Sequence, residues 1–146
     1  MNTSHEREME LTLNGVKTLL SYSDIGVGDH CIVYLHGLGS DRNDFLPACS
    51  YPGFAGFRLL VMDLPGHGLS SYPTGISLTV DDLAQALHEF VTTLRLKKIH
   101  LVGHSLGGAI ALRYAAQFAT NLVSFTNIEG NLVSEDCGIL SREIRN

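Results

Sequence analysis

The chain has 146 residues, a formal net charge of −5 and 45% hydrophobic residues, and only 17% of its residues are charged. This composition is too apolar for a disordered chain, and the lack of a basic excess argues against nucleic acid as a partner. No apolar run approaches the roughly 18 residues that span a bilayer, so we expect no membrane segment. A chain of this length fits one domain with a substantial core.

The amino-terminal residues and the cysteines bear on location. The first eight residues are polar and charged, so we expect no secretory signal. Cys31, Cys49 and Cys137 have no metal-like spacing. We expect inert buried thiols in a reducing compartment rather than a metal or redox site, and hence a cytoplasmic protein.

The first predicted elements form a hairpin. Residues 9–13 and 17–22 are typical of strands, and the Asn-Gly pair at 14–15 is a strong turn signal between them. A short apolar run over residues 31–35 predicts a buried strand. Residues 43–49 after it predict a short helix.

A second buried strand is predicted over residues 57–64, and a glycine-rich turn follows over residues 65–75. The clearest helix signal covers residues 78–94, where apolar side chains recur at steps of three and four and share one face. Thr79 is the expected N-cap, and the two aspartates at 81 and 82 suit the positive end of the helix dipole.

The remaining chain continues the alternation of strands and helices. Residues 98–102 and 122–128 predict strands, residues 105–118 predict an alanine-rich helix, and residues 134–144 predict the start of another. The order predicts an α/β fold with a mostly parallel sheet and flanking helices on both faces. In such sheets ligands bind at the carboxyl ends of the strands.

The sharpest motif is Gly103-His104-Ser105-Leu106-Gly107, which matches G-x-S-x-G between a predicted strand and a predicted helix. Only small residues fit two positions either side of the serine in so tight a turn, and glycines stand there. The Ser105 hydroxyl would project above the sheet at a helix N-terminus, which favours negative charge. The His104 side chain should diverge from it. The alternative is an ordinary glycine-rich turn.

The second motif is His36-Gly37-Leu38-Gly39, directly after the strand at 31–35. Its glycines let the backbone approach a substrate oxygen, so the N–H groups of Leu38 and Leu106 could together form an oxyanion hole. We expect His36 to brace the loop rather than to act as a base. The alternative is a simple turn out of a strand.

The third motif spans residues 63–70, Asp-Leu-Pro-Gly-His-Gly-Leu-Ser. Asp63 and His67 have a spacing that could bind a metal, but no second ligand pair is evident. We expect these polar groups to satisfy each other and the loop backbone at the rim of the site. Nucleotide binding is disfavoured because neither a full dinucleotide fingerprint nor a P-loop lysine is present. We therefore expect neither a metal nor a cofactor.

In this order and spacing, the three motifs resemble those of the α/β-hydrolase superfamily over roughly residues 10–128. The resemblance implies a nucleophilic serine at Ser105 and oxyanion N–H groups at Leu38 and Leu106. A serine at the elbow implies acyl transfer, with small esters, thioesters, lactones, amides or carbon–carbon bonds beside a carbonyl as substrates.

One expected element is missing, because the family order is Ser, then Asp or Glu, then His, and all seven histidines precede Ser105. Glu129 is a candidate acid; the alternative is a pocket or lid-hinge residue. We expect an incomplete hydrolase domain over residues 1–146 that ends after about the sixth strand, with residues 129–146 opening a lid. Such a chain would be weak or inactive alone.

The alternative is a complete short chain, acting as a non-catalytic binding module or completed by a partner. In either case the strand at 122–128 would be an open sheet edge, through which the chain could self-associate.

Overall fold

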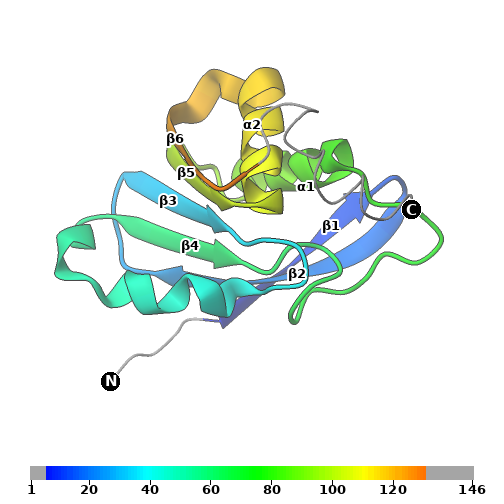
Figure 1. The fold of residues 1–146 in the computed structure, drawn as a ribbon, viewed down its shortest axis with the longest axis horizontal. Helices are drawn as coiled ribbons and strands as arrows, with labels where there is room; N and C mark the ends of the chain where they lie inside the picture. The colour runs from blue at the N-terminus through cyan, green and yellow to red at the C-terminus, as the bar shows by residue number, and fades with distance from the viewer. Residues whose placement is uncertain (1–5, 131–146) are drawn as a thin grey trace, which may run out of the picture.

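The computed structural model describes residues 6–130 (Figure 1). They form a sheet of six strands in the order β1-β2-β4-β3-β5-β6. The strands are β1 (Glu6–Leu13), β2 (Val16–Ile25), β3 (His30–Leu35), β4 (Arg58–Met62), β5 (Lys98–His104) and β6 (Leu122–Ile128), and the α-helices are α1 (Val80–Thr93) and α2 (Leu106–Phe118).

The sheet is mostly parallel, which confirms the predicted fold class. β4, β3, β5 and β6 run parallel to one another, whereas the β1–β2 hairpin joins them through an antiparallel pairing of β2 with β4. The hairpin closes at Asn14 and Gly15, which both have positive φ (48° and 80°), as a two-residue hairpin turn requires. β2 runs past residue 22 because its end, Asp24 and Ile25, pairs with β4.

The two α-helices cover one face of the sheet, as Figure 1 shows. Their apolar side chains, among them Leu87 and Phe90 of α1 and Tyr114 of α2, pack with the strands in the larger of two cores. Thr79 caps α1 as predicted, since its hydroxyl accepts the Asp82 N–H and the Asp82 carboxylate accepts the Thr79 N–H.

The opposite face carries a smaller core and corrects one prediction. Residues 43–49 do not form one α-helix; short 3₁₀ helices cover this face instead, at Arg42–Asp44, Leu46–Ser50 and Pro52–Phe54. The Phe45 N–H closes the first of them on the Arg42 carbonyl three residues back. Pro47 has no N–H with which to continue an α-helical ladder.

The predicted strand over residues 57–64 is also shorter than expected. β4 ends at Met62, although the Asp63 N–H still donates to the Ser21 carbonyl of β2 at 2.9 Å. The Asp63 side chain takes part in the site described below.

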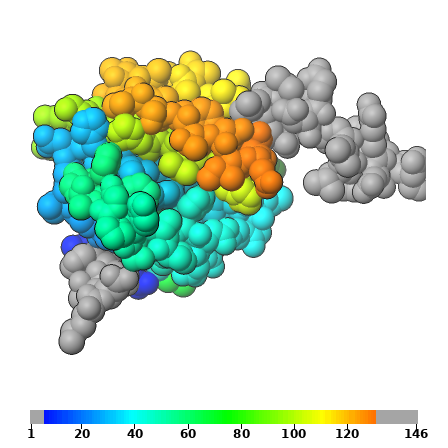
Figure 2. Space-filling view, turned by 60° about the vertical axis from the view of Figure 1, so that its left-hand side comes forward, coloured from blue at the N-terminus to red at the C-terminus, as the bar shows by residue number. Residues whose placement is uncertain are grey.

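β6 lies at the edge of the sheet, as predicted, and within the described residues it pairs with β5 alone. Val123 is 53% exposed and Ile128 is 40% exposed, and this part of the chain forms a broad patch of surface (orange in Figure 2). The predicted helix at 134–144, the lid segment beyond Gly130 and Cys137 lie outside the described residues.

Two further expectations concern the cysteines and the absence of a membrane segment. Cys31 is buried and Cys49 half-buried, both are free thiols, and burial raises the pKa of each. Between residues 6 and 130, no helix combines the length and the apolar character needed to cross a membrane.

Candidate active site

Ser105 alone makes the turn between β5, which ends at His104, and α2, which begins at Leu106. Its backbone has φ 49° and ψ −114°, a conformation that residues with a side chain rarely adopt. The Ser105 N–H donates to the Ile128 carbonyl at 2.9 Å, and the Ser105 carbonyl accepts the Gly108 N–H at 2.9 Å. The hydroxyl does not cap α2, so it is not tied to the helix that follows.

The glycines around Ser105 are required by backbone contacts. A β-carbon on Gly103 would lie 2.3 Å from the Gly107 carbonyl oxygen. A β-carbon on Gly107 would lie 2.1 Å from the carbonyl oxygen of Leu35 at the end of β3. Because these obstacles are backbone atoms, no side-chain movement could relieve them, and the spacing of the motif follows from this packing.

His36 lies fully buried at the end of β3. Its Nε2 accepts the Leu64 N–H at 3.0 Å and its Nδ1 lies 2.8 Å from the Gly37 carbonyl oxygen, so the ring carries its proton on Nδ1. Burial lowers the pKa of His36 below its ordinary value of 6.5. The ring is therefore a neutral link between two loops, and neither nitrogen is free to take a proton from Ser105.

The loop after His36 lies against the elbow because β3 and β5 are neighbours, with Leu35 opposite Gly103. A β-carbon on Gly37 would lie 3.3 Å from the Ser105 Cβ and 3.1 Å from the His104 Nδ1. Gly39 turns the loop with a φ of 74°. Within residues 6–130, neither the Leu38 nor the Leu106 N–H donates to an acceptor.

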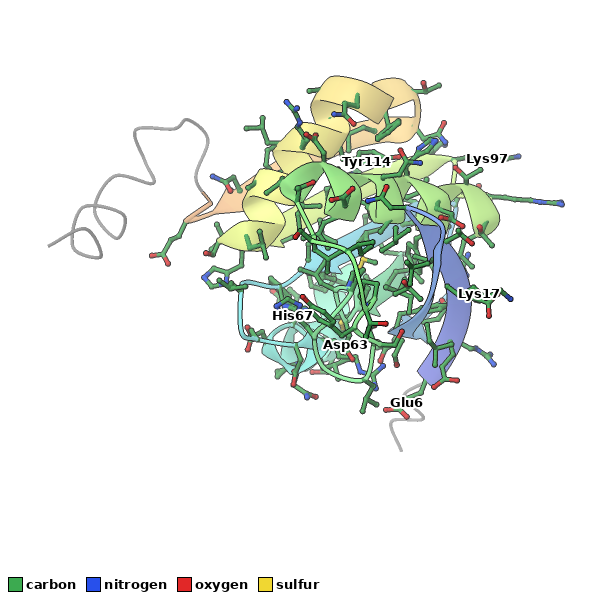
Figure 3. All side chains as sticks on the ribbon, turned by 90° about the vertical axis from the view of Figure 1, so that its right-hand side faces the viewer. Glu6, Lys17, Asp63, His67, Lys97 and Tyr114 are labelled. Atoms are coloured by element: carbon green, nitrogen blue, oxygen red, sulfur yellow. The ribbon has the colours of Figure 1, made fainter. Side chains whose placement is uncertain are left out.

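Asp63, labelled in Figure 3, lies in the loop after β4 and holds this loop to the short 3₁₀ helix that begins at Arg42. Its buried carboxylate accepts the Arg42 N–H at 2.8 Å and the Leu69 N–H at 2.9 Å. As predicted, both side chains bond the backbone, His67 Nδ1 contacting the Pro65 carbonyl at 3.1 Å; the prediction that Asp63 and His67 also bond each other is wrong. A carboxylate that accepts two backbone N–H groups has no need of the imidazole.

Sequence reasoning missed Arg42, which is only 4% exposed. Its guanidinium donates to the Ser21 hydroxyl at 3.0 Å and to the Glu6 carboxylate at 2.7 Å, and its Nε lies 3.8 Å from Asp63. These partners lie 21 or more residues away along the chain. Arginine is mostly exposed in proteins, and no local sequence pattern indicates that Arg42 is buried among such distant partners.

Glu129 follows β6 and has a φ of 54°. Its carboxylate is 3.8 Å from His104 Nε2, and its side chain is 85% exposed. Within the described residues, the ends of β3, β5 and β6 thus bring together five groups at the carboxyl ends of the parallel strands: Ser105, the Leu38 and Leu106 N–H groups, His104 and Glu129. No group of three or more metal-ligating side chains occurs among residues 6–130.

Comparison with known proteins agrees with this geometry. Residues 31–142 match the model of a family described as the alpha/beta hydrolase fold. A probable serine hydrolase of Drosophila melanogaster is 37% identical over 100 residues, which are 67% of this chain and 30% of that protein. The 2-hydroxy-6-oxononadienedioate/2-hydroxy-6-oxononatrienedioate hydrolase of a Pseudomonas species is 31% identical over 113 residues, 75% of this chain and 40% of that protein.

Among solved structures, an esterase from Exiguobacterium antarcticum superimposes with a TM-score of 0.76 at 26% identity. The similarity covers 85% of this chain and 46% of that one. The chain therefore spans less than half the length of each of these three relatives.

Proposed function

The chain belongs to the α/β-hydrolase fold family, and from that membership we propose that it supplies the nucleophile and the oxyanion-binding groups of a serine hydrolase for small acyl compounds. Ser105 attacks the substrate carbonyl, and the Leu38 and Leu106 N–H groups donate to the oxygen that becomes negative. The observation that carries this proposal is the strained backbone of Ser105 at the one-residue junction of β5 and α2.

The strain favours a chemical role for Ser105 over a structural one. A residue with a side chain in such a conformation costs on the order of 1–3 kcal/mol, and positions of this kind cluster at active sites. Glycine would make the same turn without that cost. A serine there is best explained by the need for its hydroxyl.

Two features support the oxyanion role of the backbone. The Leu106 N–H is in the first turn of α2, where N–H groups lack partners within the helix and the helix dipole favours an anion. The Leu38 N–H belongs to a loop that His36 holds at both ring nitrogens. Rigid donors of this kind need no rearrangement when charge develops on the substrate.

A serine hydroxyl also needs a base. No histidine follows Ser105 in the sequence, and both nitrogens of His36 already have partners. We assign the base to a histidine outside these 146 residues, with Glu129 as a candidate for the acid. The chain by itself is then expected to turn over far more slowly than a hydrolase with a whole triad, at the residual level that oxyanion binding sustains.

The names of two relatives suggest which group of a substrate the serine attacks. One relative is an esterase, and another is a hydrolase of an oxo-dienedioate. Both substrates hold a carbonyl that a serine can attack. We therefore propose the acyl carbonyl as the reacting group.

Labelling with an alkyl fluorophosphonate tests the proposal, with mass spectrometry to locate the adduct. The expected result is a slow, single adduct on Ser105 that is lost in Ser105→Ala and kept in Ser77→Ala, an exposed serine control. An adduct on another residue would refute the nucleophile. Fast, Ser105-dependent ester turnover by the chain alone would refute the external base.

A further inference from the structure

We propose that an apolar pocket beside Ser105 receives the acyl group of the substrate and selects acyl groups that carry no charge, rejecting those that end in a carboxylate. This inference rests on the proposed function and narrows its substrate class. It separates this chain from the dienedioate hydrolase among its relatives, whose named substrate is a dicarboxylate.

The pocket has a volume of about 250 Å³ and lies between the loop after β3, the loop after β4 and the starts of α1 and α2. Its apolar lining consists of Leu38, Tyr72, Leu78, Val80, Leu83 and Leu106. Sites for drug-sized ligands usually measure roughly 300–1,000 Å³. A pocket below that range suits one arm of a substrate rather than the whole molecule.

The pocket adjoins the groups proposed for catalysis. Leu38 and Leu106 line it with their side chains, and the same two residues supply the proposed oxyanion N–H groups. A β-carbon on Gly37, the residue before Leu38, would lie 3.3 Å from the Ser105 Cβ, so this loop passes directly beside the proposed nucleophile. A carbonyl whose oxygen faces these two N–H groups therefore has a short path for one substituent into the pocket.

The charge of the lining decides which substituent fits. Among the described residues that line the pocket, none is a lysine or an arginine, and the titratable side chains are His67 and Tyr72. His67 Nδ1 already bonds the Pro65 carbonyl, and its ring packs edge-to-face on His36 with centroids 5.1 Å apart. A substrate carboxylate in this pocket would lose its water and meet neither a lysine nor an arginine, which is unfavourable.

Apolar side chains also surround the mouth of the pocket. Of the residues that line the pocket, Leu38 is 77% exposed and Tyr72 is 63% exposed. Large apolar side chains gathered at one exposed site mark ligand or partner surfaces. Here they surround an entrance next to the nucleophile, which favours a ligand that is itself apolar.

Two p-nitrophenyl esters of equal chain length test the inference: the hexanoate, and the adipate half-ester that ends in a free carboxylate. The Ser105-dependent rate is the release of p-nitrophenolate minus that of Ser105→Ala. We expect the hexanoate to be preferred by at least about tenfold in kcat/KM, because burial of an unpaired carboxylate is costly. Equal rates, or a preference for the adipate, would overturn the inference.

A positive charge introduced into the pocket should change the preference between the two esters, and loss of stability alone would not do so. Leu78→Arg is expected to shift the preference at least tenfold toward the adipate half-ester, whereas Val27→Arg, at a residue 84% exposed near the opposite end of the sheet, leaves the preference unchanged. If Leu78→Arg does not fold, Tyr72→Arg at the exposed mouth replaces it. An unchanged preference in the folded pocket variant would contradict the inference.

A binding experiment separates this inference from the proposed function. Hexanamide and adipamic acid are titrated into ¹⁵N-labelled protein, and the amide signals of Tyr72 and Leu83 are followed. Saturable shifts with hexanamide and none with adipamic acid would support the pocket even if no Ser105-dependent turnover is seen. Absence of shifts with both, or shifts with adipamic acid alone, would overturn the inference whatever Ser105 does.

Discussion

A β-carbon on Gly107 would lie 2.1 Å from the carbonyl oxygen of Leu35, so the first turn of α2 rests directly on the end of β3. This contact holds the proposed nucleophile and the proposed oxyanion loop in one rigid unit. It involves backbone on both sides and therefore leaves no side chain to move aside.

Gly107→Ala is accordingly expected to lower the free energy of unfolding by about 3 kcal/mol or more, at the upper end of overpacking effects. The measurement is urea denaturation followed by circular dichroism. Gly53→Ala is the matched control, because its β-carbon would meet only the exposed Tyr51 ring, which can swing away. A loss in Gly107→Ala no larger than in the control would contradict the packing argument.

Replacement of Ser105 separates stability from chemistry. Ser105→Gly is expected to be more stable than Ser105→Ala by about 1–2 kcal/mol, since glycine relieves the cost of the positive φ and alanine does not. Both variants lack the hydroxyl and should fail to react with a fluorophosphonate. Equal midpoints for the two variants in urea would mean that the backbone of Ser105 stores no strain.

The buried imidazole of His36 gives stability a dependence on pH. Because burial lowers the pKa of His36 in the folded chain, the unfolded chain binds more protons once the pH falls below about 6.5. The free energy of unfolding should therefore fall as the pH drops below that value, by at most about 1.4 kcal/mol per pH unit from this residue.

His36→Gln, measured by urea denaturation at pH 8 and pH 5.5, should show a smaller difference between the two pH values than the parent chain. His100→Gln is the control for the second histidine whose pKa is lowered, by burial and by the neighbouring His30. If His36→Gln keeps the full pH dependence, the effect belongs to other groups.

The carboxylate of Asp63 is expected to matter more for stability than any exposed acid. Asp63→Asn removes the charge beside the buried Arg42 and weakens the acceptors for two backbone N–H groups. We expect a loss of roughly 3 kcal/mol, as for other buried pairs that lose one partner. Asp29→Asn, at an exposed position, should change the urea midpoint little, and similar losses in both variants would rule out a special role for Asp63.

The open edge at β6 is expected to cause self-association, because its outer backbone groups have no partner within the described residues. Sedimentation velocity at rising protein concentration should show larger species in the parent chain and fewer in Thr126→Lys, where a charge sits on the edge strand. Thr120→Lys, outside the strand, adds the same charge as a control. Equal association in both variants would exclude this edge.

The local features of this protein follow from its sequence alone. The Asn14-Gly15 turn, the capped helix α1 and the close approach of Gly103 to Gly107 depend on residues within a few positions of one another, where backbone sterics and helix periodicity act. Because the three motifs each follow a strand, their position at one edge of a parallel sheet could also be predicted. The proposals of Ser105 as nucleophile and of Leu38 and Leu106 as oxyanion residues rest on this local reasoning.

Only the tertiary structure decided how distant segments meet. β4 lies between β2 and β3, an order that no local pattern encodes. Arg42 reaches Ser21 and Asp63 across 21 residues in each direction, and the proposed acyl pocket needs the loops after β3 and β4 and the starts of α1 and α2. Such contacts depend on which buried surfaces fit together when the whole sheet closes, and periodicity along a single segment carries no information about that fit.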